Sequence, residues 1–399
     1  MKLHRKLLVP SLLLSLSTAF SSIVSAVNIR IDYRYDTNNF FDTPEKRGAM
    51  EAVANFYSEL LTNNLLRIDP AEFRSASWTA RITNPQTGSI TTIDNLIVPE
   101  DEIIVFVGSR SLPGTTVGTG GPAGFSAGGF SDWFERIDGR GNPNAAAEPI
   151  SQRLEFATWG GSIAFDSPRN WNFSLNSNES GTEFIAVALH EMAHVLGIGT
   201  ADAWENQIVN GRFTGPAATA SNGFPPFADN SHFTNSLESD LFGSFSVRHG
   251  TDGPVLMLAS SFDNGFFFEV ITDLDLAALT DLGWQVDPEV RLDATDLSNP
   301  SPRLLIETVS FKDYRVDRVA DLDDAFTTAI DTQTGTGDFI AILDSNPLPS
   351  RAFYRVESSD RFASQQSREA SRKSGSAQTQ ESYSTRSREP VVVHGCCNH

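Results

Sequence analysis

Apolar residues in the N-terminal part of the chain follow two patterns, first an alternation with polar residues and then a helical spacing. From Val27 to Asp36 apolar and polar residues alternate, which predicts a first strand. A helix is predicted next, because Thr43 and Pro44 form a helix start and apolar residues from Met50 to Leu61 recur at helical spacing. We expect this helix to pack on a sheet. Three later runs predict strands, the first two joined as a hairpin: Trp78 to Ile82, Ile90 to Ile97 and Glu102 to Val107.

Glycine changes the pattern in the middle of the chain. Eight glycines fall between Gly108 and Gly129, and the segment has neither of the glycine-rich spacings that hold phosphates at the start of a helix. It therefore predicts a mobile surface loop. Trp159 to Asp166 predicts a further strand with a glycine-weakened start, and we expect this strand at the edge of a sheet.

An apolar helical segment, Phe184 to Trp204, follows that strand. Ser180 and Glu183 have the spacing of a capping box, and Gly197 stands where a left-handed C-terminal cap is expected. We therefore expect a short, buried helix. The next segment, Gln207 to Asp229, is rich in Gly, Pro, Ala and Asn, which predicts an ordered but irregular excursion.

The C-terminal half divides into three parts. Thr272 to Trp284 predicts a helix with a Thr cap, an acidic first turn and a terminal glycine, and it closes a first domain spanning 27–289. Residues 290–357 hold short alternating runs, which predict a small β-sandwich-like module. Residues 358–399 have few apolar side chains, which predicts a disordered polar tail.

Residues 1–26 have the three parts of a secretory signal peptide. A cationic start is followed by an apolar run from Leu7 to Phe20 and by a small-x-small ending at Ala26, so cleavage is expected before Val27. The alternative is a retained membrane anchor, but the apolar run is short and interrupted by Ser. We expect a secreted or periplasmic protein, and no later stretch is a candidate membrane span.

The overall charge narrows the choice of partners. The chain has 399 residues, of which 40% are hydrophobic, enough to bury a large core. Its formal net charge is −20, and residues 27–357 alone carry −25. A body of this charge repels nucleic acid and anionic membrane surfaces, so neither is expected as a partner.

Bound calcium (Ca²⁺) would suit the acidity, although no DxDxDG-like loop is present. The only cysteines, Cys396 and Cys397, leave the body without a disulfide.

The candidate chemistry lies in the apolar helix, at His190-Glu191-x-x-His194. Residues four apart stack on one face of a helix, so both imidazoles can reach one metal ion, with Glu191 beside the place of an attacking water. The pattern also occurs by chance, and the plain alternative is a core helix with two incidental histidines. Burying two His and a Glu on an apolar helix is costly unless they are paired or hold a metal, which favours zinc (Zn²⁺). A catalytic zinc site normally takes a third protein ligand.

The segment HEMAHVLGIG resembles the metzincin zinc peptidases, whose motif is HExxHxxGxxH followed by a Met-turn. Thr200 stands where that motif has its third His. The later segments are most similar to leishmanolysin-like secreted bacterial metallopeptidases, in which the third His follows an insertion. Four segments carry this resemblance: Phe213 to Ala218, Ser231-His232-Phe233, Met257, and Thr272 to Trp284. The resemblance implies that His232 is the third zinc ligand and that Met257 is the Met-turn residue.

Three other residues stay open as the third ligand. His249 is the alternative histidine, since it lies close in sequence to Met257. Asp202 has almost the spacing of an aspzincin ligand, and Glu205 has the residue type of a gluzincin ligand. Both acidic residues follow the HExxH motif more closely than those families require.

The resemblance implies an α+β fold, with a metzincin-like zinc peptidase domain (mixed twisted sheet, active-site helix, Met-turn) followed by the small all-β sandwich-like module. It implies a secreted zinc-dependent endopeptidase that hydrolyses protein or peptide substrates, with Glu191 as general base. Trp159 to Asp166 would then be the sheet edge that pairs with substrate. The alternative is a catalytically silent extracellular binding or adhesion protein on the same fold, against which the intact Glu191 argues. No oligomeric state is indicated.

Overall fold

In the computed structural model the described residues are 27–141, 152–153, 155–174, 180–234, 237–242, 252–258, 271–287, 303–320, 325–326, 329–337, 339–345, 353–361 and 383–391. The predicted signal segment 1–26 lies outside them, as do His249, Cys396 and Cys397. Among the described residues no helix is long and apolar enough to span a membrane.

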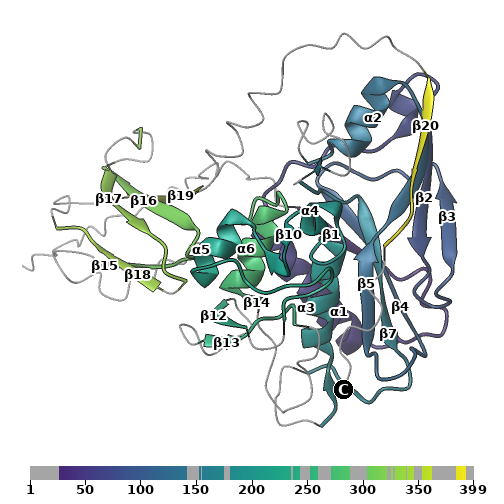
Figure 1. The fold of residues 1–399 in the computed structure, drawn as a ribbon, viewed down its shortest axis with the longest axis horizontal. Helices are drawn as coiled ribbons and strands as arrows, with labels where there is room; N and C mark the ends of the chain where they lie inside the picture. Colours follow the sequence, from purple (N-terminus) through teal and green to yellow (C-terminus); the bar gives the residue numbers. More distant parts are fainter. Residues whose placement is uncertain are drawn as a thin grey trace, which may run out of the picture.

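A four-stranded sheet of order β1-β4-β7-β5 forms the centre of the N-terminal part (Figure 1). Its strands are β1 (Asn28–Asp32), β4 (Glu102–Arg110), β7 (Gly160–Asp166) and β5 (Gly118–Pro122). The first three run parallel, and β5 pairs antiparallel with β7. The apolar run of β4 is buried on both faces, as expected of a central parallel strand. The prediction that β7 forms the sheet edge is wrong, because β5 lies outside it.

Two helices cover one face of this sheet and share its main hydrophobic core. They are α1 (Pro44–Leu60), which begins where the Thr43-Pro44 signal predicts, and α3 (Phe184–Val195), which is buried along its whole length. The Tyr57 hydroxyl donates to the carbonyl oxygen of Leu189 at 2.9 Å, which ties α1 to the middle of α3. The opposite face of the sheet packs against a second apolar cluster. This cluster includes side chains of β2 (Ser77–Thr83), Trp78 among them, and of α2 (Ser131–Asp138).

Of the predicted helix-end signals, the capping box before α3 is wrong, whereas the glycine after α3 and the Thr cap of the C-terminal helix are confirmed. The capping box predicted at Ser180 and Glu183 is absent, because Glu183 is the N-cap and makes no side-chain cap hydrogen bond. Gly197 does adopt the left-handed conformation expected after α3, with φ of 110°. The predicted C-terminal helix is α6 (Asp273–Asp281), and Thr272 closes a full capping box at its start.

The glycine-rich segment Gly108–Gly129 is not the predicted mobile loop, since it holds two successive strands. After β5 and one further residue comes β6 (Gly124–Gly129). It enters a second sheet of order β20-β6-β2-β3, in which β3 is Ile90–Asp94 and β20 is Ser384–Arg388. The glycines allow a close approach to α3. A Cβ on Gly118 would lie 2.6 Å from Oε1 of Glu191, and one on Gly120 would lie 2.4 Å from the Glu191 carbonyl oxygen. Small residues are therefore required where β5 crosses the helix.

The other elements of this part are short. The second sheet contains the predicted hairpin, β2 (Ser77–Thr83) with β3 (Ile90–Asp94). The irregular excursion predicted at Gln207 to Asp229 holds β10, β11 and α5. The remaining bounds are η1 (Pro70–Glu72), α2 (Ser131–Asp138), β8 (Trp171–Asn172), β9 (Thr182–Glu183), α4 (Asp202–Glu205), β10 (Ile208–Val209), β11 (Arg212–Phe213), α5 (Pro216–Asn222), β12 (Glu238–Phe242), β13 (Asp252–Pro254) and β14 (Ile271–Thr272).

Five strands follow α6, beside α5 and α6 and away from the main sheet (Figure 1). They pair as two small sheets, β15-β18 and β17-β16-β19, over a shared apolar cluster. Ser310 links them to α6, since its N–H and hydroxyl donate to Asp273 at 3.1 and 2.5 Å. That the strands form an independent all-β module stays a prediction. Their bounds are β15 (Arg303–Glu307), β16 (Lys312–Val319), β17 (Ala329–Thr334), β18 (Phe339–Leu343) and β19 (Phe353–Asp360).

Part of the segment predicted as a disordered tail is ordered. β19 extends to Asp360, and β20 (Ser384–Arg388) pairs antiparallel with β6. The rest of 358–399 lies outside the described residues, except the residues flanking these strands. The prediction of disorder is therefore wrong for β20, whose backbone hydrogen bonds hold it in place without apolar burial.

Asp281, the last residue of α6, is buried and caps the start of α5. Its Oδ1 and Oδ2 accept the N–H groups of Ala217 and Ala218 at 2.9 and 2.8 Å. Burial raises the pKa of Asp281 to about 7. Because the folded-state pKa exceeds the unfolded value of about 4, protonation stabilises the fold fully below about pH 4, and this contribution is lost as the pH rises through about 7.

We expect Asp281→Asn to remove this pH dependence. Between pH 5 and pH 7 the free energy of unfolding of the wild type should fall by about 2 kcal/mol relative to that of the variant. Urea titrations of both proteins at several pH values measure the difference. A difference between the two proteins that does not change with pH would contradict the assignment.

Candidate metal centre

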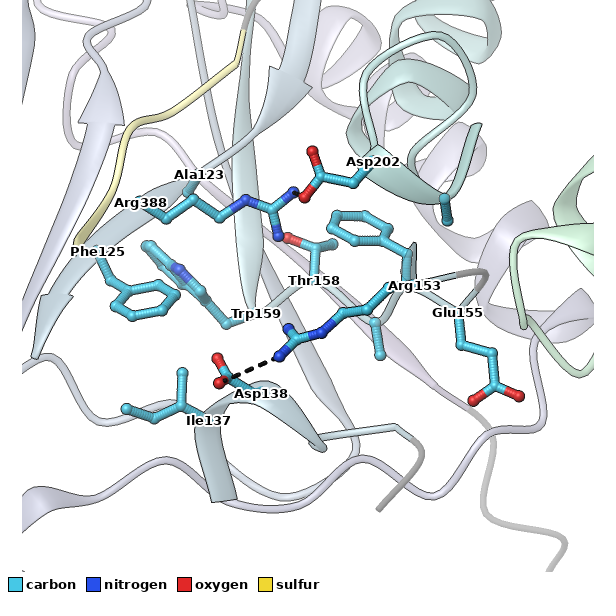
Figure 2. A pocket seen from close by; sticks show the side chains of 13 residues that line it. Ala123, Phe125, Ile137, Asp138, Arg153, Glu155, Thr158, Trp159, Asp202 and Arg388 are labelled. Carbon is cyan, nitrogen blue, oxygen red and sulfur yellow. Dashed lines mark hydrogen bonds and ion pairs between the residues drawn. The ribbon is translucent and has the colours of Figure 1, made fainter. Parts of the chain in front are cut away.

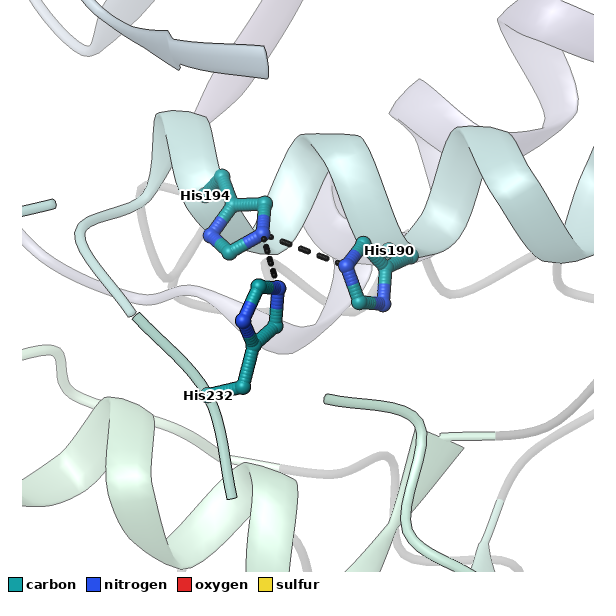
Figure 3. A group of neighbouring side chains, drawn as sticks. All are labelled: His190, His194 and His232. Atoms are coloured by element: carbon teal, nitrogen blue, oxygen red, sulfur yellow. Dashed lines mark hydrogen bonds between the residues drawn. The ribbon is translucent and has the colours of Figure 1, made fainter. Parts of the chain in front are cut away.

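Three histidine side chains converge beside α3 (Figure 3). His190 and His194 project from the helix, and His232 reaches them from a segment 38 residues after His194. The Nε2 atom of His194 lies 3.1 Å from Nε2 of His190 and 3.2 Å from Nε2 of His232. Four-coordinate zinc, with Zn–N distances of about 2.0–2.1 Å, holds its ligand nitrogens about 3.3 Å apart. The spacing of the three rings therefore fits zinc.

Backbone carbonyls fix the tautomers of two rings. Nδ1 of His190 lies 2.8 Å from the carbonyl oxygen of Leu256, and Nδ1 of His194 lies 2.7 Å from that of Ile198. A carbonyl oxygen only accepts, so each Nδ1 carries the proton and each Nε2 keeps a lone pair. The two lone pairs meet at 3.1 Å with no hydrogen between them. A cation bound there would relieve this repulsion.

Burial keeps the three rings neutral. Desolvation lowers the pKa of His190 to about 3 and that of His232 to about 4, and it lowers the pKa of His194 well below its ordinary value. The neighbouring histidines add to the lowering for His190 and His194. Neutral imidazole is the form that binds a metal, so the cluster is ready to act as a ligand set at neutral pH.

Glu191 is fully buried on α3, and neither of its carboxylate oxygens has a hydrogen-bond partner within the described residues. The nearby N–H of Gly120 on β5 favours the charged form without reaching hydrogen-bond geometry. Burial dominates and raises the pKa of Glu191 well above its ordinary value. A buried carboxyl without partners is costly, so its partner is expected from outside the chain. A water between Glu191 and the histidines would supply it.

A turn far along the chain orients His190. The turn is formed by Leu256 and Met257, whose N–H groups donate to Oδ2 and Oδ1 of Asp275 at 3.0 and 3.1 Å. Leu256 then presents its carbonyl oxygen to the His190 ring. Asp275 belongs to α6, where it also accepts the hydroxyl and the N–H of Thr272. One buried carboxylate thus joins α6 to the turn that positions a candidate ligand.

The same turn braces His232. Phe233 follows this histidine and donates its N–H to the carbonyl oxygen of Met257 at 2.9 Å. The N–H of His232 donates to Oδ1 of Asp229 at 2.8 Å, and Asp229 donates its own N–H back to the His232 carbonyl oxygen. The Met257 side chain is fully buried. The proposed Met-turn residue therefore connects the backbone supports of His190 and His232.

The other candidate ligands lie elsewhere or outside the description. His249 is not among the described residues. Asp202 and Glu205 belong to α4, where Asp202 pairs with Arg388 at 3.4 Å and Glu205 is exposed. Neither joins the cluster of three histidines. Thr200, at the place of the third His in the metzincin motif, donates its hydroxyl to the His194 carbonyl oxygen at 2.6 Å.

Sequence reasoning missed two supports of the site. The first is β5, whose glycines at 118 and 120 meet Glu191, and whose small-residue run GTGGP was the available signal. The second is Asp275, which composition marks only as part of an acidic first helical turn. Its role needs the fold, because its partners Leu256 and Met257 come from another segment.

A family comparison agrees with this geometry. The Matrixin family model matches residues 123–209, a segment that contains α3 with its HExxH motif, covers well under half of the chain and ends before His232. The match supports a metzincin-type zinc metallopeptidase, for which zinc and protein substrates are implied. The helices and mixed sheets fit an α+β metallopeptidase fold. No curated protein and no solved structure matches the chain.

Asp275→Asn should weaken zinc binding, because an amide cannot accept from both N–H groups of the Leu256-Met257 turn. Loss of an outer support of this kind typically lowers metal affinity about 10–100-fold. Competition with a zinc chelator measures the affinity. Asp273→Asn is the matched control, since Asp273 is buried on the same helix but bonds Ser221 and Ser310. Equal zinc affinities of both variants would refute the role of Asp275.

Proposed function

We propose that the protein is a secreted zinc-dependent endopeptidase, in which His190, His194 and His232 hold zinc and Glu191 is the general base. One observation carries the proposal: two fixed imidazole lone pairs and a third ring meet at α3, the helix that also holds the buried Glu191 carboxyl, which has no hydrogen-bond partner among the described residues. Zinc, when bound, supplies a Lewis acid that activates water and polarises a peptide carbonyl.

Glu191 can transfer the proton that passes from water to the leaving amine in this reaction. Hydrolysis adds water across the C–N bond, with the hydroxyl joining the carbonyl carbon and a proton joining the leaving nitrogen. A carboxylate whose pKa is raised by burial is a stronger base, so Glu191 can take the water proton and then deliver it to the leaving amine. The histidines stay neutral throughout because their pKa values are lowered.

The edge strand β5 favours cleavage inside a chain. One side of β5 pairs with β7, and on the other side a single backbone hydrogen bond is described, from the N–H of Val391 to the carbonyl oxygen of Pro122. An extended peptide can add to such an edge through main-chain hydrogen bonds. This pairing needs neither terminus of the substrate, which suits an endopeptidase. Secretion is proposed from the signal-like sequence of residues 1–26 alone. Bound calcium is proposed only from the acidic composition of the chain.

Glu191→Gln tests the chemistry. Because the amide cannot accept a proton, we expect casein hydrolysis to fall about 10²–10⁴-fold while bound zinc is retained. Product release and zinc content are measured on the same samples. Unchanged casein hydrolysis by the variant would contradict the proposal. Wild-type protein that holds zinc but cleaves no peptide in a library would instead favour the silent binding protein.

Zinc stoichiometry of two histidine variants tests the ligand set. We expect His232→Ala to lose zinc and His249→Ala to retain one zinc per chain. Atomic absorption on dialysed protein provides the measurement, with circular dichroism to confirm folding. Retention of zinc by His232→Ala together with its loss from His249→Ala would reverse the assignment of the third ligand.

A further inference from the structure

The C-terminal strand β20 occupies the edge of the second sheet, and the residues after it reach β5, the strand whose glycines lie against Glu191. Strand β20 pairs antiparallel with β6 from Ser384, opposite Gly129, to Arg388, opposite Phe125. Beyond the strand, Val391 bonds the backbone of Pro122 on β5 at 3.1 Å. Figure 1 shows this yellow strand running along the second sheet toward β5. The chain's own tail thus follows the course that an extended peptide would take toward Glu191.

Two arginines lie on one face of β20, and each contacts a carboxylate and an aromatic ring. Arg386 forms an ion pair with Asp138, the last residue of α2, and its guanidinium lies 4.5 Å from the centre of the Phe134 ring. A carboxylate and an aromatic face together favour a cationic side chain, through charge and through the ring quadrupole. The C-terminal end of α2 adds a partial negative charge.

Arg388 has an equivalent environment two residues on. Its guanidinium pairs with Asp202 of α4 at 3.4 Å and lies 5.3 Å from the centre of the Phe156 ring. Among the described residues the Asp202 carboxylate pairs with this arginine alone. Figure 2 shows Arg388 and Asp202 at one side of a pocket and Asp138, paired with Arg153, at the other.

The strand is attached in a way that permits exchange. Ser384 to Ser387 are exposed, and Tyr383 beside them is 55% exposed, so β20 buries little apolar surface. Its side-chain contacts are ion pairs and cation–π contacts of partly exposed arginines, and both kinds of contact are weak where water reaches them. Competing peptides can replace its backbone hydrogen bonds one for one. The net charge of −25 on residues 27–357 also attracts cationic peptides.

We propose that the β6 edge, with Asp138 and Asp202, binds the extended segment of a peptide substrate that carries cationic side chains at alternating positions, and that β20 occupies this site as an intramolecular competitor. The proposal rests on the proposed function and names the substrate class of that site. Because β20 runs toward β5 with its C-terminal end, a substrate on the same course has its scissile bond several residues C-terminal to the cationic pair.

Peptide binding to full-length Glu191→Gln protein tests the site without peptide hydrolysis. The probe is a fluorescein-labelled nonapeptide with the sequence of residues 383–391, YSTRSREPV, measured by anisotropy. Arg386→Ala/Arg388→Ala should weaken the hold of the tail and tighten probe binding about tenfold. Thr385→Ala/Ser387→Ala, on the other face of the same strand, is the matched control and should leave the probe affinity unchanged.

A second probe, in which both arginines are Gln, tests the recognition of charge. We expect it to bind the Arg386→Ala/Arg388→Ala protein at least tenfold more weakly than the arginine probe, and Asp202→Asn to reduce this discrimination. Equal affinity for both probes, or no gain from the double arginine variant, would overturn the proposal. If wild-type protein hydrolyses casein while the probes bind equally, the inference fails alone. If the probes discriminate but nothing is cleaved, the peptidase function fails instead.

Discussion

The hydrogen bond between Nδ1 of His190 and the carbonyl oxygen of Leu256 joins residues 66 positions apart, and the site depends on it. The apolar helix α3 buries two histidines and a glutamate, which is unfavourable unless each polar group has a partner. Carbonyl oxygens of Leu256 and Ile198 satisfy the outer ring nitrogens, and in doing so they turn the inner nitrogens toward one point. The same bonds that make burial tolerable therefore prepare a metal site.

This arrangement ties α6 to the Met257 turn, because Asp275 lies 18 residues after Met257 and accepts its N–H. The carboxylate of Asp275 is buried, which raises its pKa to about 6, yet it accepts hydrogen bonds from the turn and from Thr272. In helix α6 it serves both as a capping-box residue and as the anchor of the turn. The position of His190 thus depends on how α6 packs, although α6 contributes no ligand.

The elements with strong local periodicity were predictable, and the elements held by distant contacts were not. Sequence patterns predicted α1, α6, the β2-β3 hairpin and the central strand β4, since each has its own apolar period or cap. The HExxH spacing indicated two metal ligands, and the family resemblance supplied His232, which the structure brings to the same cluster. Asp275 and the β5 glycines were beyond reach, because their roles come from partners on other segments.

The three strands that the sequence patterns did not predict share one physical property. β5 and β6 are glycine-rich and β20 is polar, so none of them shows the apolar alternation by which strands are usually recognised. Backbone hydrogen bonds hold all three. On β5 the glycines let the strand approach Glu191, and a Cβ at Gly118 would meet the Glu191 side chain. An edge that presents backbone rather than side chains is also the kind of surface on which an extended peptide can pair. The features that hid these strands from sequence reasoning are therefore those that suit them to bind a polypeptide.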